Sequence, residues 1–341
     1  LVDTPVGAAA ILTVDLDDAT GYGRVVRGDG DRVVAIVEHR DATPEQLALH
    51  EVNAGMYAFD LDGLADRLAS ITGDNAQSER YVTTVVERLV AEGSEVRAIR
   101  VALEEVGVND QLQLADAGTI LRRRHLRRLM QSGVAVLDPA ATWIDVTVDV
   151  EPDATILPGC LLTGASHVAA GAVVGPHTTL HDTEVGVDAR VMQSWCDTAA
   201  IADGATVGPF AHLRPGTELG TGGKVGAFAE VKKSTIGAGS KVPHLSYVGD
   251  ATIGEGVNFA CGAITVNYDG FDKYQTIIGD GAFIGCDTML VAPVEVGAGA
   301  FVAAGSTITD DVPADALAIA RARQATKEGW AARRREAAAS D

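Results

Sequence analysis

The sequence has few aromatic residues and no long apolar run, and both shortages narrow the class of protein. Phe, Trp and Tyr make up 5% of the 341 residues, although hydrophobic residues reach 47% and glycine occurs 38 times. A core of Val, Ile, Leu and Ala with frequent Gly is typical of a solenoid of short strands and tight turns. No apolar run approaches the roughly 20 residues of a membrane span, and no signal peptide is visible. We therefore expect no membrane association.

Cysteine is also scarce, and the four copies form no CxxC pair and no metal-ligand spacing: Cys160, Cys196, Cys261 and Cys286. Reduced thiols in a cytoplasmic protein fit this pattern best. Basic residues are also few: the sequence has 27 Lys and Arg and 47 Asp and Glu, which gives a net charge of −20. Nucleic acid is therefore not an expected partner. We interpret the five arginines between Arg122 and Arg128 as a solvated helical face.

The chain length suits two domains, and the first of them looks incomplete. Residues 1–110 mix strand signals at 24–26 and 33–38, joined by a Gly28–Gly30 turn, with helix signals at 44–49 and 83–92. This is an α/β pattern. Since the chain begins with Leu1 and not Met, we expect it to lack its true N-terminus.

Residues 111–138 are predicted to link the domains, with a helix over 111–132 that ends at Gly133. Leu112, Ala115, Leu121 and Leu129 are its candidates for burial.

Residues 139–341 carry a different pattern, in which aliphatic residues recur every six positions. Three runs show it: Val150, Ile156, Leu162, Val168, Val174, Leu180; Ile201, Val207, Leu213, Leu219, Val225, Val231; and Ile278, Ile284, Leu290, Val296, Val302, Ile308. Each hexapeptide forms a short strand and a turn, and three of them close a triangular coil. The aliphatic residue points inward and stacks on its equivalents at about 4.8 Å. We expect about nine stacked coils and a mainly β fold.

Breaks in the period locate candidate functional segments. Steps of five residues occur from Val231 to Ile236 and from Val248 to Ile253. After Thr265 the segment VNYDGFDKYQT interrupts the pattern altogether. A polar insertion cannot enter the packed prism, so we expect it to project as a loop that can reach a neighbouring coil in an oligomer.

Polar residues near these breaks suggest an anion site with a base beside it. Arg214 and Lys232 are 18 residues apart, which is one coil, so the two cations should stack about 5 Å apart. Stacked positive charges repel unless an anion such as phosphate lies between them. His244 lies nearby, with Tyr247 beside it, and histidine is the side chain best suited to take a proton near neutral pH. Glu230 is a candidate to orient the His244 ring.

The chain resembles the bacterial bifunctional N-acetylglucosamine-1-phosphate uridyltransferase/glucosamine-1-phosphate N-acetyltransferase family from about residue 15 to residue 330. The resemblance rests on GPFAHLRPGTEL, GAFAEVKKSTIG, GSKVPHLSYVGDATIG, TVNYDGFDKYQTIIGD, LVAPVEVGAGAFVAAGSTIT and ALAIARARQATKEGW. It implies a left-handed parallel β-helix with a C-terminal tail, preceded by a linker helix and a partial α/β nucleotidyltransferase domain. It also implies a homotrimer whose acetyltransferase sites lie between subunits.

The resemblance implies a role for each matched residue of the coil. His244 would be the general base that deprotonates the sugar amine for attack on acetyl-CoA, in the synthesis of UDP-N-acetylglucosamine for peptidoglycan and the cell envelope. The sugar phosphate would be held by Arg214, Lys232, Tyr247, Asn258 and Lys273. Acetyl-CoA would contact Asn267, Tyr268, Ala304 and Arg321. Cys261 and Cys286 would border acetyl-CoA where Ala and Ser are usual, so we expect an altered coenzyme affinity.

The first 110 residues match only the second half of a uridyltransferase domain. By resemblance, Gly23, Glu38 and Asn53 would contact the uridine sugar nucleotide, and Asn109 would help to bind Mg²⁺. Asp110 and Thr84 replace the usual Asn and Asp. No Gly-rich nucleotide loop precedes these motifs, so the triphosphate has no cradle. We expect the parent protein, and not this chain alone, to make UDP-N-acetylglucosamine.

Three other functions are known for coils of this kind or could be carried by one. Another hexapeptide O- or N-acyltransferase would use the same coil but would not need the Arg214–Lys232 pair. A γ-type carbonic anhydrase needs three histidines, and only His212 and His244 occur from Ile201 onward, which sets it aside. A non-catalytic solenoid that binds coenzyme A would show binding without turnover.

Overall fold

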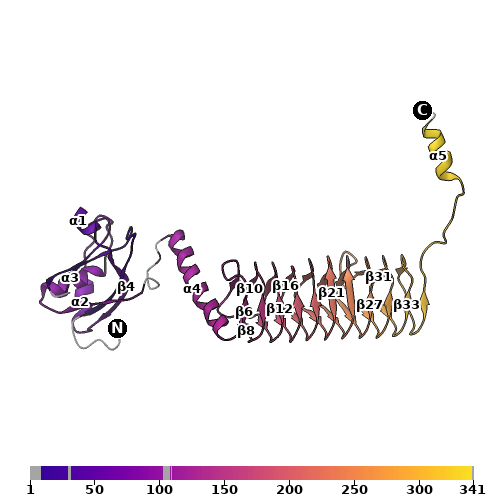
Figure 1. The fold of residues 1–341 in the computed structure, drawn as a ribbon, viewed down its shortest axis with the longest axis horizontal. Helices are drawn as coiled ribbons and strands as arrows, with labels where there is room; N and C mark the ends of the chain where they lie inside the picture. Colours follow the sequence, from indigo (N-terminus) through magenta and orange to yellow (C-terminus); the bar gives the residue numbers. More distant parts are fainter. Residues whose placement is uncertain (1–8, 30–31, 103–107, 109, 340–341) are drawn as a thin grey trace. The chain divides into compact units, whose positions relative to one another are not determined.

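The computed structural model describes residues 9–29, 32–102, 108 and 110–339, which divide into two compact units, Leu1–Leu121 and Arg122–Asp341. Figure 1 shows a small α/β unit and a long coil of stacked strands. The two units are described separately.

The first unit contains a five-stranded sheet with the order β3-β2-β4-β1-β5. Its strands are β1 (Ala9–Asp15), β2 (Arg24–Arg27), β3 (Val33–Val37), β4 (Glu51–Phe59) and β5 (Val96–Arg100). Strand β5 runs parallel to β1, and the other pairs are antiparallel. Its helices are α1 (Pro44–Leu47), α2 (Leu64–Ala69) and α3 (Thr83–Ala91). Helix α3 buries Val85, Val86 and Leu89 in the core that the sheet provides.

The α/β interpretation of this unit is confirmed, with boundaries close to those expected for β2, β3, α1 and α3. Strands β1, β4 and β5 were not predicted. The predicted turn ends at Gly30, which lies outside the described residues.

Helix α4 (Gln111–Gln131) matches the predicted linker helix, and its last turns pack on the coil. Leu126 and Leu129 belong to the core of the second unit. The Arg122 guanidinium lies 5.1 Å from the centre of the Trp143 ring, and the four other arginines of the run are exposed. Leu112 and Leu121, expected to be buried, are 72% and 57% exposed, and Ala115 is exposed as well, because the residues of α4 that join the core, Leu126 and Leu129, lie in its last turns.

The second unit is a three-sided coil of parallel strands that form eleven-, ten- and nine-stranded sheets. We call these walls 1, 2 and 3, in the order in which the chain visits them. Wall 1 contains β6 (Ala135–Val136), β9 (Thr155–Ile156), β12 (Val173–Val174), β15 (Arg190–Val191), β18 (Thr206–Val207), β21 (Lys224–Ala227), β24 (Lys241–His244), β27 (Asn258–Phe259), β30 (Phe283–Ile284), β33 (Phe301–Val302) and β35 (Leu317–Ala318).

Walls 2 and 3 are built in the same way, with one strand from each successive coil. Wall 2 contains β7 (Trp143–Ile144), β10 (Leu161–Thr163), β13 (Thr179–His181), β16 (Trp195–Asp197), β19 (His212–Leu213), β22 (Glu230–Lys232), β25 (Tyr247–Gly249), β28 (Ile264–Val266), β31 (Met289–Val291) and β34 (Thr307–Ile308). Wall 3 contains β8 (Asp149–Val150), β11 (His167–Val168), β14 (Glu184–Val185), β17 (Ala199–Ile201), β20 (Thr217–Leu219), β23 (Ser234–Ile236), β26 (Ala251–Ile253), β29 (Thr276–Ile278) and β32 (Val294–Val296). A last helix, α5 (Trp330–Ala338), lies in the tail.

The strands stack in register, so that each inward residue meets its equivalent on the next coil. Leu162 pairs with Leu180, and Leu213 with Val231. All four side chains are fully buried in one continuous core that runs the length of the coil. The predicted mainly β fold of stacked hexapeptide coils is therefore confirmed, with ten strands on wall 2 where about nine coils were expected.

The predicted projecting loop lies between β28 and β29. Residues 267–275 belong to no strand; one antiparallel bridge, from Tyr268 to Lys273, closes the loop on itself. Phe271 at its tip is 90% exposed. The loop leaves the coil where wall 2 ends and wall 3 begins, beside the short five-residue steps. None of the described helices is both long and apolar enough to cross a bilayer.

Two neighbouring leucines of β10 test the inward stack. Leu162 is fully buried, whereas Leu161 is 40% exposed. Replacing Leu162 with Ala opens a cavity, so we expect the free energy of unfolding to fall by about 2–5 kcal/mol. Leu161→Ala, the matched control, is expected to change it by less than about 0.5 kcal/mol. Urea unfolding of both variants measures the difference, and equal losses would contradict the inward assignment of Leu162.

Candidate functional site

The cations predicted to stack do so at the corner between walls 2 and 3. Strand β19 pairs with β22, with Leu213 opposite Val231. Arg214 and Lys232 follow these two residues, so they lie on successive coils about 4.8 Å apart along the backbone. The Arg214 Nη1 donates a hydrogen bond to Glu230 Oε1 at 2.7 Å, which raises the pKa of Arg214. This salt bridge holds Arg214 against wall 2.

The projecting loop brings a third cation to the same corner. The Lys273 side chain lies against that of Lys232, and this contact is the largest cause of a lowered pKa at Lys232. Desolvation and repulsion from the charges of Lys273 and Arg214 act in the same direction, while Asp250 opposes them. Three cationic side chains thus converge on one place. A bound anion would relieve their repulsion.

Asp250 ties the loop to the coil beneath it, and sequence reasoning missed this residue. Its Oδ2 accepts a hydrogen bond from Asn267 Nδ2 at 2.5 Å. The backbone between them is tight, since a Cβ on Gly249 would lie 2.4 Å from the Tyr247 hydroxyl and 2.8 Å from Asn267 Nδ2. The five-residue step beginning at Val248 was the only sequence signal at this point. Asp250 therefore positions the start of the projecting loop.

His244 lies at the other edge of wall 2, at the corner with wall 1. It is the last residue of β24, it is exposed, and its backbone lies in register with Ala227 on the preceding coil. Ser246 Oγ donates a hydrogen bond to the His244 carbonyl at 3.0 Å. The ring itself accepts and donates no hydrogen bond among the described residues. A side chain held this way is free to meet a bound molecule.

Four of the predicted coenzyme contacts continue upward from His244 in a single line. The pairs Phe259–Ile284 and Ile284–Val302 fix the register, and Cys261, Cys286 and Ala304 each follow two residues later. The Asp287 amide donates to the Cys261 carbonyl, and the Gly305 amide donates to the Cys286 carbonyl, both at 2.8 Å. A Cβ on Gly305 would lie 3.9 Å from Arg321 Cδ. We call His244, Cys261, Cys286, Ala304 and Arg321 the corner column.

Other predicted residues lie away from this column. Asn267 and Tyr268 are with the cations at the corner of walls 2 and 3. Asn258 begins β27 on wall 1, opposite Lys241. Tyr247 stands in register with Glu230 on wall 2. Within one chain, wall 2 therefore separates the base from the cations.

The expected contact between Glu230 and His244 is not formed. The Glu230 carboxylate pairs with Arg214 instead, across two neighbouring coils of wall 2, whereas His244 ends β24 on wall 1. Among the described residues no hydrogen bond or ion pair joins His244 to Glu230, Arg214 or Lys232.

An exposed apolar strip leads along the corner of walls 1 and 2 toward His244, and sequence reasoning missed it. Phe210, Phe228 and Leu245 occupy the same turn position on successive coils and are 52%, 61% and 57% exposed. The Phe210 and Phe228 rings stack with centres 5.3 Å apart. Each of the three residues has a φ near +55° to +59°, a region that favours glycine. Bulky apolar side chains at such strained, exposed turns are typical of a surface that another molecule covers.

Three predicted residues of the uridyltransferase half gather on the sheet of the first unit. The Asn53 amide donates to the Gly23 carbonyl at 2.9 Å, and Asn53 Nδ2 donates to the Tyr57 hydroxyl at 2.6 Å. Burial raises the pKa of Glu38, which accepts a hydrogen bond from Thr83 Oγ1 at 3.1 Å. A Cβ on Gly23 would lie 3.3 Å from the Glu38 carboxylate.

Asn109, the predicted Mg²⁺ ligand, lies outside the described residues. The part of the chain that the structure describes contains no group of three or more His, Cys, Asp or Glu side chains arranged to hold a metal ion.

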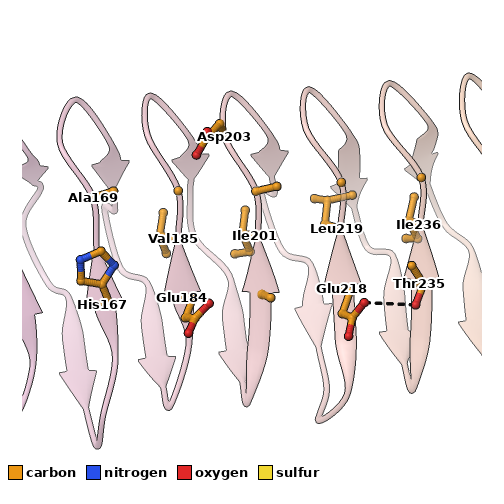
Figure 2. A pocket seen from close by; sticks show the side chains of 15 residues that line it. His167, Ala169, Glu184, Val185, Ile201, Asp203, Glu218, Leu219, Thr235 and Ile236 are labelled. Carbon is orange, nitrogen blue, oxygen red and sulfur yellow. Dashed lines mark hydrogen bonds between the residues drawn. The ribbon is translucent and has the colours of Figure 1, made fainter.

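A groove of about 560 Å³ lies on wall 3, away from these residues. Figure 2 shows Glu184 and Glu218 at its surface on separate coils, with Val185, Ile201, Leu219 and Ile236 in the layer behind them. The charged side chains that line it include three carboxylates (Glu184, Asp203, Glu218) and no Lys or Arg. Such a surface repels phosphate, so the groove is not the site of the cations described above.

Comparison with known proteins agrees with the coil. The bacterial transferase hexapeptide family (six repeats) matches residues 275–310. Three relatives are each named bifunctional protein GlmU. That of Kineococcus radiotolerans is 53% identical over 327 residues, which cover 95% of this chain and 66% of the relative. Those of Streptomyces avermitilis and Mycolicibacterium vanbaalenii are 50% and 47% identical, over 98% and 99% of this chain and 70% and 69% of each relative.

The chain thus spans about two thirds of the length of these relatives, and about half of its aligned residues are identical to theirs. Its α/β unit, its stacked hexapeptide coils and the projecting loop all fall within the matched length. This chain belongs to the family of bifunctional GlmU proteins.

Proposed function

We propose that this chain transfers the acetyl group of acetyl-CoA to the amine of glucosamine 1-phosphate, giving N-acetylglucosamine 1-phosphate and coenzyme A. The observation that carries the proposal is the corner column, in which a free imidazole is followed, coil by coil, by the residues expected to border the coenzyme. An extended acyl-thiol arm can lie along such a line with its thioester at the His244 end. Membership of the GlmU family supports the same chemistry.

The cation cluster suits the phosphate of the sugar. Arg214, Lys232 and Lys273 provide charge-assisted donors, and their mutual repulsion falls when a dianion binds. The Glu230 carboxylate keeps Arg214 in place before the sugar arrives. Tyr247 and Asn258 are the proposed polar contacts to the sugar itself.

His244 would act as the general base. The sugar amine is a nucleophile only when it has lost its proton, and an imidazole near neutral pH can accept a proton as the carbon–nitrogen bond forms. The thioester carbon then releases the coenzyme thiol. Asn267 and Tyr268, which Asp250 positions through Asn267, are proposed to contact acetyl-CoA from the loop.

We also propose that the working unit is a homotrimer. The base and the cations lie on opposite edges of wall 2, so a complete pocket needs the edge of a second copy beside the first. The apolar strip of Phe210, Phe228 and Leu245 gives a surface for that contact next to His244. Phe271, on the loop, is a further exposed apolar side chain able to reach a neighbouring copy.

For the whole protein we propose a second step, in which UTP uridylylates the product with the help of Mg²⁺. Gly23, Glu38 and Asn53 would contact the sugar nucleotide, and Asn109 would contribute to the metal site. The metal would supply charge neutralisation at the phosphates. A cytoplasmic location, where acetyl-CoA and reduced thiols occur, is part of the same proposal.

Removing the base tests the assignment of His244. We expect thiol release from acetyl-CoA to depend on glucosamine 1-phosphate and to fall by about 10²-fold or more in His244→Ala, because that is the usual scale for a lost general base. His212→Ala, which removes another exposed histidine of the coil, is the control and should retain its rate. Equal rates in the His244→Ala variant and the unmodified chain would defeat the proposal.

Lys273 offers a test through pH. The lowered pKa of Lys232 means that this side chain loses its proton, and with it its hold on phosphate, at a lower pH than an ordinary lysine. In Lys273→Met the repulsion from Lys273 is gone, while that from Arg214 remains, and the pKa of Lys232 rises. We therefore expect the alkaline limb of kcat/KM to move to higher pH, while the KM for the sugar phosphate rises by about tenfold for one lost charge-assisted contact.

The control for this experiment is Lys233→Met, which removes an exposed lysine next to Lys232 in the sequence. It should leave the alkaline limb in place. An unmoved limb in Lys273→Met would show that the Lys232–Lys273 contact plays no part in substrate binding.

A further inference from the structure

The four cysteines fall into two physical classes. Cys160 and Cys196 are 2% and 0% exposed inside the coil, and burial raises the pKa of Cys196 to about 12. A buried thiol that stays protonated is unreactive. Cys261 is half-buried and Cys286 is exposed, and both belong to the corner column.

Cys261 and Cys286 are neighbours in space although 25 residues separate them in the sequence. Strand β27 pairs with β30 in register, and each cysteine follows its strand by two residues. The hydrogen bond from the Asp287 amide to the Cys261 carbonyl, at 2.8 Å, holds the two turns together. Successive coils are about 4.8 Å apart, which falls within the 4.4–6.8 Å between Cα atoms that a disulfide spans.

The remaining surroundings favour reaction at this pair. His244 lies one coil below Cys261 and can take up a thiol proton. The chain between the two cysteines includes the projecting loop, and this insertion is why their spacing carries no motif in the sequence.

We propose that Cys261 and Cys286 form an oxidisable thiol pair, and that joining them into a disulfide closes the acetyl-CoA track. With a peroxide as oxidant, the Cys286 thiol becomes a sulfenic acid and one water is released. The Cys261 thiol then attacks that sulfur, the S–S bond forms and a second water leaves. Two thiols thus lose two hydrogens while the peroxide O–O bond is reduced, and a dithiol reductant restores the pair.

The bridge would act on the coenzyme because of where it lies. The two side chains stand in the corner column between His244 and Ala304, where the acyl-thiol arm is proposed to run. A disulfide places both sulfur atoms across the path of the acyl-thiol arm and closes the space between the two side chains. This consequence rests on the proposed function, whereas the formation of the bridge does not.

The experiment treats the whole chain with hydrogen peroxide, quenches it, and maps the disulfide-linked peptides by mass spectrometry. We expect a Cys261–Cys286 link, with Cys160 and Cys196 still reduced. Acetyl transfer should fall at least about tenfold in the oxidised chain and return with dithiothreitol. In Cys286→Ser and Cys261→Ala, the oxidised rate is compared with the reduced rate of the same variant, and each ratio should stay near one.

The possible outcomes separate the two proposals. Absence of the linked peptide overturns the thiol pair, whatever the activity. A mapped link with unchanged acetyl transfer overturns the closing of the track. If the reduced chain transfers no acetyl group, the proposed function fails, while a mapped link still supports the pair.

Discussion

In-register stacking of parallel strands is the constraint from which the rest of the coil follows. Because each inward aliphatic residue must meet its equivalent on the next coil, a shift of one residue would turn the core side chains outward. The stack therefore fixes the height of every outward residue as well. Arg214 lies one coil from Lys232, and Cys261 one coil from Cys286, for the same reason that Leu213 lies on Val231.

The projecting loop is the one place where the chain leaves this constraint beside the cations. There Asp250 holds Asn267, and Lys273 comes back against Lys232. The contact between two lysines is unfavourable by itself, and the stacked coil beneath holds it in place. A site whose charges are already arranged spends little free energy on reorganisation when its anion binds.

The sequence predicted the features that depend on periodicity. A six-residue repeat is a long-range pattern with one structural solution, so the coil, the stacked cations and the projecting loop could all be anticipated. Contacts that depend on side-chain direction could not. The Glu230 carboxylate forms its salt bridge with Arg214 on the neighbouring coil of wall 2. The six-residue repeat does not determine which partner an outward side chain contacts.

The sheet of the first unit, the role of Asp250 and the number of coils were not predicted, each for a different reason. The strands β1 and β4 pair residues 36 to 50 positions apart, beyond the reach of local patterns. Asp250 is an ordinary acidic residue until the fold places Asn267 above it. The coil begins at β6, before residue 139 where the repeat was expected to start, so the number of coils was underestimated.

The end of helix α4 has a consequence for the solubility of the coil. A stack of parallel strands leaves unpaired backbone groups and an open apolar core at its first coil, which is a template for strands of another chain. Leu126 and Leu129 cover that opening next to Val134 and Ile144. The helix thus acts as a lid against end-to-end polymerisation, and the exposed arginines on its other side keep that end in water.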